Sequence, residues 1–393
     1  MTSPAEAAAR PNPVITWNVH AQTAIFEVAK QSPSAATRSF AITQGAVYDA
    51  VNAIAGSPYK PYLVAPPARR GDSTPAAVAT AAYRTLVWLF PAQASSLRAQ
   101  YDEALAAIPD GPSEQGGIAV GEATAAAMIN ARRDDGAFSD AKWPVGTEPG
   151  QYRLTPPGFL QVGAWFATLK PFVITPSAYR TPGPPPLTSA AYARDFNEVK
   201  TLGSATSTVR TAEQTEAATW WDDPRLVEWS IKRQLATTHR LGALQTARMF
   251  AMVDLAAADS LIACYQEKKR WAFWRPVTAV PLADTDGNPA TGADPAWTPL
   301  RTTAPSAEYP SGHACFTTAT TVALRTYFGR DDVSFSAYSA DSGTTRHYRS
   351  LSRAAAELDQ ARIWAGVHYR FATTDGHRLG NSVARDVLHR AFG

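Results

Sequence analysis

Alanine-rich segments with apolar residues at helical spacing recur along most of the chain, and this periodicity constrains the fold more than any other feature. Segments that alternate apolar and polar residues, as a half-buried strand does, are scarce. The periodicity predicts helices over residues 36–55, 75–108, 113–133, 212–238 and 241–265. We therefore expect an all-α fold of helical bundles, in which two bundles pack together.

Two long segments lack this periodicity. Residues 134–189 are dense in proline and glycine (PVGTEPG, LTPPGF and TPGPPPL), which predicts an ordered loop that covers a surface or shapes a cleft. Residues 282–309 contain ADTDGNPATGADP and are also expected to be irregular.

A short internal echo is compatible with a duplicated helical unit. Arg38, followed by Ser-Phe-Ala-Ile, precedes Asp49 by eleven residues, and Arg248, followed by Met-Phe-Ala-Met, precedes Asp259 by the same separation. Repeated units would give two bundles, although a single match in an alanine-rich chain is equally compatible with chance.

A chain of 393 residues is long enough for two hydrophobic cores. We expect one helical domain with an N-terminal bundle and loops at residues 17–205 and a C-terminal bundle at residues 206–393. Three segments that combine lysine, arginine or histidine with glycine or proline lie after residue 206, so we expect the second bundle to hold the chemistry.

Composition and charge exclude several classes of function. Hydrophobic residues make up 45% of the chain and charged ones 18%, as in soluble globular proteins. The net charge of +3 is small and its lysines and arginines are scattered, so we expect neither nucleic acid nor a membrane as partner. The N-terminus lacks an apolar signal core, so we expect no export signal in the sequence as given, although an exported form that has lost its signal is also possible. The sequence does not indicate the compartment, and a homo-oligomer is a further possibility.

Cys264 and Cys315 are the only cysteines in the sequence. Two cysteines exclude a disulfide framework and a four-cysteine zinc site. We expect buried free thiols, with a single disulfide between them as the alternative.

The first of three C-terminal motifs is Lys268-Lys-Arg-Trp-Ala-Phe-Trp-Arg275-Pro276. Lys268 and Arg275 are seven residues apart, nearly two helical turns, so a helix would direct both to one side. Pro276 is expected to end that helix at Arg275. Two cations on one face call for an anion, although a solvated basic face also explains this motif taken alone.

The second motif is Pro310-Ser311-Gly312-His313, which precedes a helical run to Tyr327. At a helix start, the Ser311 hydroxyl and the Gly312 N–H would form an oxyanion cradle, strengthened by the helix dipole. His313 beside it can exchange protons near neutral pH. Taken alone, the tetrapeptide is equally compatible with a plain helix cap.

The third motif contains Arg362 and His368, whose six-residue separation places them on different faces of a continuous helix. They converge only if the helix ends between them, and Gly366 is the expected stop. A further helix is expected to start after Gly376.

In order and spacing, these motifs resemble the signature that vanadium-dependent haloperoxidases share with type 2 phosphatidic acid phosphatases and bacterial class A acid phosphatases: K-x(6)-R-P, P-S-G-H and R-x(5)-H. Residues 196–203 (FNEVKTLG), Cys264 and residues 46–54 (AVYDAVNAI) resemble the bacterial haloperoxidase-like branch. The similarity extends over most of the chain from about Trp17 onward.

This resemblance implies a pocket for vanadate, which phosphate could also occupy. It implies that His368 binds vanadium, that His313 is the acid-base group, and that Lys268 and His368 also take part in catalysis. The oxygens of the anion would be held by Lys268, Arg275, Ser311, Gly312 and Arg362.

The chain departs from many relatives beside two of these residues. Ala361 stands where they have a serine, and Ala372 where they have an aspartate, with Asp375 the nearest later acid. We expect Asp259, on the preceding helix, to orient one of the arginines. Ser306 occupies a position where some haloperoxidases have phenylalanine or histidine, so the halide preference does not follow from the resemblance.

Three hypotheses follow for function. The leading one is a vanadate-dependent haloperoxidase, in which hydrogen peroxide oxidises halide to hypohalous acid or an equivalent that halogenates a small organic nucleophile. The second is an acid phosphatase, in which His368 forms a phosphohistidine and His313 protonates the leaving alcohol. The third is a non-catalytic oxyanion-binding helical protein, which would not need His313. The upstream resemblance and the length of the chain favour the haloperoxidase.

Overall fold

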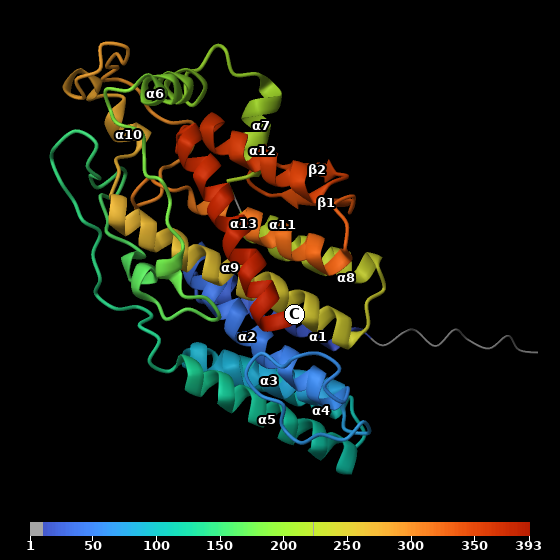
Figure 1. Cartoon of the computed structure of the whole chain (residues 1–393). Helices are drawn as coiled ribbons and strands as arrows, with labels where there is room; N and C mark the ends of the chain where they lie inside the picture. Colours follow the sequence, from blue (N-terminus) through green and yellow to red (C-terminus); the bar gives the residue numbers. More distant parts are fainter. Residues whose placement is uncertain (1–10, 223) are drawn as a thin grey trace, which may run out of the picture. The chain divides into compact units, whose positions relative to one another are not determined.

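The computed structural model describes residues 11–222 and 224–393, and nearly all of its regular structure is helical (Figure 1). The longer helices are α1 (Pro13–Gln22), α2 (Pro33–Ile54), α3 (Thr74–Leu89), α4 (Ala94–Ala106), α5 (Pro112–Arg132), α6 (Ala190–Leu202), α7 (Ala212–Trp220), α8 (Pro224–Thr238), α9 (Ala243–Trp271), α11 (Gly312–Phe328), α12 (Leu351–Trp364) and α13 (Arg370–Phe392). Shorter helical segments lie at Thr23–Val28, Pro91–Gln93, Ala164–Thr168, Pro176–Ala178, α10 (Pro276–Ala279) and Ala283–Thr285. The predicted all-α fold is confirmed.

The helices predicted from periodicity are all present, and two of them are interrupted. Helices α2, α5 and α9 match the predicted segments, and α9 continues beyond the predicted end to Trp271. The segment predicted at 75–108 is divided between α3 and α4 around Pro91, and the one predicted at 212–238 between α7 and α8, which begins at Pro224. Proline lacks the N–H that a continuous helix needs, so it interrupts one helix and suits the first turn of the next. In the described part of the chain, no helix has an apolar stretch long enough to cross a membrane.

The proline- and glycine-rich segment 134–189 contains only two short 3-10 turns, as its composition predicts. The segment 282–309 contains one such turn and is otherwise irregular. The periodicity did not indicate helices α1, α6 and α10, nor a hairpin of β1 (Phe335–Ser339) and β2 (Thr344–Tyr348), paired antiparallel with Phe335 opposite Tyr348. Strands of five residues are too short to give a strong alternating pattern.

The described residues form two compact units, each assembled from several segments. The first comprises residues 11–31, 39–131 and 236–251, and the second residues 32–38, 132–222, 224–235 and 252–393. The boundaries of these units differ from the expected division into bundles at residues 17–205 and 206–393. That division into bundles stays a prediction.

In the first unit, α5 packs against α3 at very short range. A Cβ atom on Gly117 would lie 2.3 Å from the carbonyl oxygen of Ser73, and one on Gly121 would lie 2.7 Å from that of Ala77. Only glycine allows two helix backbones to approach this closely. Side chains would push α3 and α5 apart.

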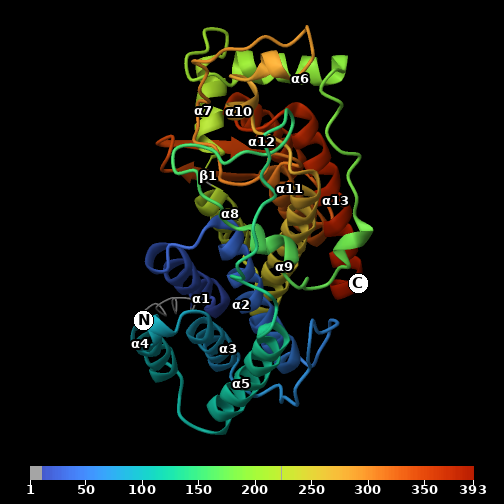
Figure 2. The ribbon, with the colours of Figure 1, turned by 90° about the vertical axis from the view of Figure 1, so that its left-hand side faces the viewer.

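In the second unit, α11 packs against α12 and α13, and the three helices lie next to one another in both views (Figures 1 and 2). A Cβ on Gly376 of α13 would lie 2.7 Å from the Ser311 carbonyl oxygen, and one on Gly380 would lie 2.4 Å from that of Cys315. These glycines are one helical turn apart and therefore share a face of α13. Together they seat α13 directly against the N-terminal half of α11.

The internal echo corresponds to one structural device that occurs in each unit. Asp49 of α2 accepts hydrogen bonds of 2.6–3.0 Å from the backbone N–H groups of residues 62–64. Asp259 of α9 accepts bonds of 2.7–2.9 Å from those of residues 172–174. In both cases a buried carboxylate on a helix satisfies three successive amides of an irregular segment, which would otherwise be costly to bury.

Candidate active site

A cavity of about 170 Å³ lies in the second unit, and it brings together six of the seven residues predicted to form the pocket. The seventh, Ser311, is buried but does not line the cavity. The predicted role of the 134–189 loop in shaping a cleft is confirmed, because two of its residues line the cavity. The full lining is Ser32, Pro33, Ser34, Thr37, Val162, Gly163, Trp229, Leu261, Tyr265, Lys268, Arg275, Ala304, Pro305, Ser306, Gly312, His313, Phe316, Arg362 and His368.

Lys268 and Arg275 reach the cavity from different backbone elements. Helix α9 ends at Trp271 and Ala272 has a φ of 39°, so the chain leaves the helix before Arg275. The predicted common helix face is therefore wrong. Pro276 does not end α9. It restricts Arg275 to an extended conformation, with φ −80° and ψ 155°, and begins α10.

Lys268 is buried and is held by two carbonyl groups. Its Nζ donates to the oxygens of Ala307 at 2.6 Å and Glu308 at 2.9 Å. Burial, reinforced by the positive charge of Arg275, lowers the pKa of Lys268 to about 8. The ammonium therefore sits close to its deprotonation midpoint at mildly alkaline pH.

Arg275 joins the loop before α11 to the turn between α12 and α13. Its Nε donates to the Ser306 carbonyl at 2.9 Å and its Nη2 to the Ser306 hydroxyl at 3.1 Å. Its Nη1 donates to the Val367 carbonyl at 2.8 Å and lies 3.1 Å from His368 Nε2. The guanidinium is buried but stays charged, because the pKa of arginine starts so high.

The predicted helix start at the second motif is confirmed. Ser311 is the N-cap of α11 and its hydroxyl accepts from the Ala314 N–H. Gly312 and His313 occupy the first two helical positions, where backbone N–H groups have no acceptor within the helix. Both residues line the cavity, so the positive end of the helix dipole faces it.

Arg362, in the last turn of α12, is held by a carboxylate that the motif search did not find. Its Nη1 donates to Asp222 at 2.9 Å, and Asp222 also accepts from Arg301 at 2.8 Å. Burial acts to raise the pKa of Asp222, but Arg362 and Arg301 outweigh it and the net pKa is lowered. The Nε of Arg362 is buried and has no hydrogen-bond partner among the residues that the structure describes.

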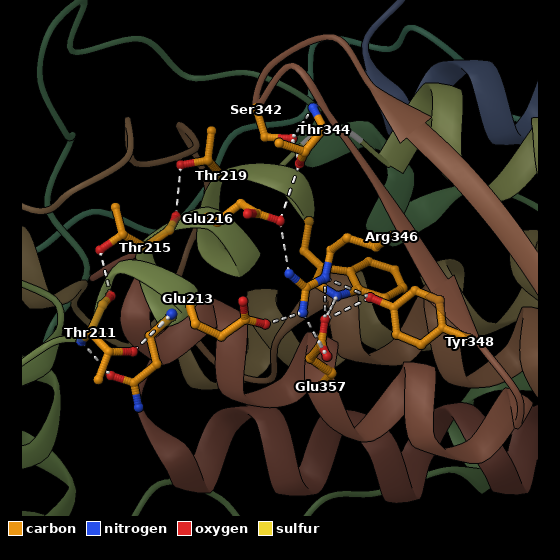
Figure 3. A network of polar contacts seen from close by, with 12 residues as sticks. Thr211, Glu213, Thr215, Glu216, Thr219, Ser342, Thr344, Arg346, Tyr348 and Glu357 are labelled. Carbon is orange, nitrogen blue, oxygen red and sulfur yellow. Dashed lines mark hydrogen bonds and ion pairs between the residues drawn. The ribbon is translucent and has the colours of Figure 1, made fainter.

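A polar network ties together the elements that carry Asp222 and Arg362 (Figure 3). Arg346 of β2 meets Glu213 and Glu216 of α7 at 2.6 and 3.0 Å, and Glu357 of α12 at 3.0 Å. The Tyr348 hydroxyl also donates to Glu357, at 2.6 Å. One guanidinium therefore links α7, the hairpin and α12.

The turn between Arg362 and His368 depends on a backbone contact with α6. Helix α12 ends at Trp364, and Gly366 has a φ of 78°, so the predicted stop is confirmed. The next helix begins at Arg370, earlier than the predicted start after Gly376. A Cβ on Gly366 would lie 2.3 Å from the carbonyl oxygen of Gly203, the last residue of the FNEVKTLG segment. This contact gives that segment a structural role beside the site.

The tautomer of His368 follows from its two neighbours. Arginine can only donate, so His368 Nε2 accepts from Arg275 and Nδ1 carries the proton, which it donates to Glu308 Oε1 at 2.8 Å. The same oxygen accepts from the Tyr369 N–H at 3.1 Å. Burial and the adjacent cations hold the pKa of His368 well below its usual range, so the ring is neutral.

Glu308 is fully buried among Lys268, Arg275 and His368. Burial raises its pKa to about 7, against the influence of the two cations. Glu308 lies outside the second motif as the sequence pattern defines it, so no role was predicted for it. The missed signal is an acid two residues before P-S-G-H, and the signal for Asp222 is the polar pair that follows Trp220-Trp221.

His313 also has a strongly lowered pKa, caused by burial and then by the charge of Arg362, with Asp222 opposing both. Its imidazole is therefore neutral at neutral pH and able to accept a proton. It lines the same cavity as His368. The site thus contains two neutral imidazoles beside three cationic side chains.

Two further expectations concern residues next to the site. Asp259 does not orient a pocket arginine, because its oxygens accept the backbone N–H groups of residues 172–174, so that prediction is wrong. Asp375 accepts from Tyr309 at 2.8 Å and from Arg378 at 3.1 Å.

Cys264 and Cys315 are buried free thiols, as expected.

The donor set matches an oxyanion. Lys268, Arg275 and Arg362 supply positive charge, the start of α11 supplies backbone N–H groups, and the buried Nε of Arg362 lacks an acceptor. An anion in the cavity would provide that acceptor. His368 lines the same cavity and its Nε2 is unprotonated, so it can serve as a ligand or a nucleophile toward the central atom of such an anion.

Comparison with known proteins agrees with this geometry. Residues 248–392 match the model of the VCPO second helical-bundle domain. The vanadium chloroperoxidase of Curvularia inaequalis is 32% identical over 150 residues, which cover 31% of this chain and 24% of that protein. The aligned part thus spans about a quarter of this curated relative.

Solved structures extend the similarity in fold to the rest of the chain. The first bacterial vanadium-dependent iodoperoxidase to be crystallised superposes with a TM-score of 0.81 over 96% of both chains, at 23% identity. The holo form of a bacterial vanadium-dependent chloroperoxidase superposes with a TM-score of 0.70 over 93% of this chain and 95% of its own, at 19% identity. The chain therefore shares the fold of these crystallised vanadium-dependent haloperoxidases, and its residues 248–392 match the VCPO second helical-bundle domain.

Proposed function

We propose that this protein is a vanadate-dependent haloperoxidase, which uses hydrogen peroxide to oxidise halide to hypohalous acid or an equivalent. The observation that carries the proposal is the state of His368: neutral, with Nδ1–H fixed on Glu308 and the Nε2 lone pair among the oxyanion donors. A single unprotonated nitrogen beside cations and N–H donors suits a metal that brings several anionic oxygens of its own, and these oxygens would replace Nε2 as the acceptor for Arg275.

In this proposal, His368 Nε2 binds vanadium, and the oxygens are held by Lys268, Arg275, Ser311, the Gly312 N–H and Arg362. Ser311 fits this set through its hydroxyl proton, because its oxygen already accepts from Ala314. Bound vanadate would supply Lewis acidity that activates peroxide toward attack by halide, without a change in the oxidation state of the metal.

The protein's own contribution is charge and proton transfer. The neutral His313 accepts a proton from hydrogen peroxide as it enters, and returns one to the oxygen that leaves as water. Lys268 and Arg275 hold positive charge at the reacting oxygens. Glu308 keeps His368 in the tautomer that leaves Nε2 unprotonated, and Asp222 keeps the Arg362 guanidinium in place.

The test reconstitutes the metal-free protein with orthovanadate and measures peroxide-dependent oxidation of iodide, bromide and chloride. The metal-free sample is assayed in parallel for hydrolysis of a phosphate monoester. We expect vanadate-dependent halide oxidation. Hydrolysis alone would identify an acid phosphatase that uses His368 as nucleophile, and vanadate binding with neither activity would identify an oxyanion-binding protein.

A further inference from the structure

The carboxylate of Asp222 divides its two oxygens between two arginines. Its Oδ1 accepts from Arg362 Nη1 at 2.9 Å, and its Oδ2 accepts from Arg301 Nε at 2.8 Å. Arg362 lines the oxyanion cavity, whereas Arg301 does not. A guanidinium often takes both oxygens of one carboxylate in a bidentate pair. Arg301 therefore occupies the oxygen that Arg362 would need for a bidentate pair with Asp222.

This division leaves most of the Arg362 guanidinium for the cavity. Arginine carries five N–H groups in a fixed plane, and Arg362 gives one of them to Asp222. Its Nε is buried and has no acceptor in the described part of the chain. A second bond to Asp222 would rotate this plane and turn N–H groups away from an anion in the cavity. The single bond to Asp222 thus keeps these groups available to the anion.

Arg301 is held at both its backbone and its side chain. Its backbone N–H donates to the carbonyl oxygen of Ala365 at 3.0 Å, directly after the end of α12. Its Nη2 donates to Asp341, in the turn between β1 and β2, at 2.9 Å. The backbone of Arg301 therefore lies against the end of the helix that carries Arg362, while its side chain reaches from the hairpin to Asp222.

The two carboxylates that hold Arg301 lie on elements that the polar network joins independently (Figure 3). Asp222 lies two residues after the end of α7, and Asp341 lies in the hairpin turn. Close to that turn, the Thr344 hydroxyl donates to Glu216 of α7 at 3.2 Å. Replacement of Arg301 would therefore leave α7 and the hairpin joined, with both carboxylates on them.

The exposure of Arg301 limits its direct effect on an anion. Its side chain is 29% exposed, so dissolved ions screen the charge that it presents to the cavity. Ion pairs at such partly exposed positions also contribute little to stability. The contact with Asp222 is therefore the route by which Arg301 can affect the anion site.

We propose that Arg301 is a positioning residue for the oxyanion. By holding Asp222 Oδ2, it limits Asp222 to one bond with Arg362 and keeps the other N–H groups of Arg362 directed at the anion. Asp341 anchors Arg301 from the hairpin. This inference rests on the proposed function, which assigns Arg362 to the oxyanion, and it adds a residue that lies outside the three motifs and outside the cavity lining.

The experiment measures anion binding by calorimetry, with orthovanadate and, separately, inorganic phosphate added to the metal-free protein. The variant R301M removes the donors of Arg301 and keeps a side chain of similar length. It is expected to weaken the binding of both anions about tenfold, the effect of one charge-assisted hydrogen bond. The variant R301K should restore most of the affinity, because an ammonium can also occupy Asp222 Oδ2. The ratio of affinities between R301M and the unaltered protein should be the same at low and at high ionic strength.

Two further variants separate this role from charge and from stability. Arg325 of α11 pairs with Asp331 at 2.9 Å, is 45% exposed and does not line the cavity, so R325M removes the same charge and should leave the affinity unchanged. In D222N the carboxylate is absent, so adding R301M to it should cause no further loss. Urea denaturation identifies the folded fraction of every variant, to which the affinities refer.

Anion binding by R301M as tight as by the unaltered protein would overturn the inference. Equal losses in R301M and R325M, a loss in R301M that disappears at high ionic strength, or a full further loss in the double variant with D222N would overturn it too. If the unaltered protein binds neither anion, the proposed function fails and the inference fails with it. If it binds both anions more tightly than R301M does but oxidises no halide, the haloperoxidase function is overturned and the role of Arg301 stands.

Discussion

The two copies of the internal echo use the same local device for different ends. Asp49 and Asp259 each hold three successive backbone N–H groups. Helix α2 ends at Ile54, five residues after Asp49, whereas α9 continues to Trp271, twelve residues after Asp259. The additional turns of α9 carry Lys268 into the oxyanion cavity, whereas α2 reaches that cavity only with its first turns, at Pro33, Ser34 and Thr37, before its Asp49.

The difference shows that a buried carboxylate which holds a loop is a structural feature of both units, and that Lys268 of the cavity lies on α9 beyond this carboxylate. The first copy then serves as an internal control for the second. A change in the second unit should alter vanadate binding or turnover, and its counterpart in the first unit should alter stability alone.

The largest effect is expected for H313A. Loss of the acid-base imidazole should lower the rate of halide oxidation about 10²- to 10⁴-fold while vanadate still binds. His20 of the first unit is the control, and H20A should retain the activity of the unaltered protein. Steady-state rates and vanadate titrations measure both, and an H313A protein with normal turnover would remove His313 from the mechanism.

The next effect concerns two glycines that follow helix ends. Gly366 follows α12 with φ 78°, and Gly56 follows α2 with φ 86°. In G366A, backbone strain adds to the contact with the Gly203 oxygen, so we expect a loss of about 3 kcal/mol in the free energy of unfolding. In G56A, the added Cβ would contact only the Arg70 side chain, at 3.7 Å, so we expect a loss of about 1–2 kcal/mol in the free energy of unfolding.

Urea denaturation measures both values, and vanadate titration of the folded proteins adds a second comparison. Affinity should fall in G366A, since the turn positions His368, and should be unchanged in G56A. Equal losses of stability in the two variants would show that the α6 contact has no energetic consequence.

A smaller effect is expected when the carboxylate behind His368 is neutralised. E308Q should weaken vanadate binding about 10- to 100-fold, because an amide no longer fixes the imidazole tautomer as a carboxylate does. D49N alters a buried carboxylate of the first unit and should lower stability without changing the affinity of the folded fraction. Binding as tight in E308Q as in the unaltered protein would contradict the assigned tautomer.

The smallest effect depends on pH. Lys268, with a pKa of about 8, is cationic at pH 7 and loses its charge as the pH rises through 8. Vanadate should therefore bind about tenfold more tightly to the unaltered protein than to K268Q at pH 7, through one charge-assisted hydrogen bond. That ratio should approach one above pH 8. The ionisation of vanadate affects both proteins equally and therefore cancels in the ratio of their affinities. A ratio that stays constant from pH 7 to 9 would show that Lys268 does not titrate in that range.

Local sequence patterns were sufficient for most of the helices and, together with the family resemblance, for six residues that line the cavity. The periodicity of α2, α5 and α9, the serine cap of α11 and the glycine after α12 all depend on interactions within a few residues. Such short-range rules can be read without knowledge of the tertiary structure. The prediction of a common helix face for Lys268 and Arg275 failed because Ala272 leaves the helix through a left-handed conformation that no local glycine signals.

Only the tertiary structure decided which partners hold the pocket residues in place. Glu308 lies 60 residues from His368, and Asp222 lies 140 residues from Arg362. The meeting of Gly203 with Gly366 likewise joins distant segments. Hydrogen bonds and close backbone contacts between distant segments depend on how the helices pack. The spacing of residues within a motif does not predict that packing. The sequence by itself therefore indicated six residues that line the cavity, and the packing of α6, α7, α12 and the loop before α11 decided how they are held.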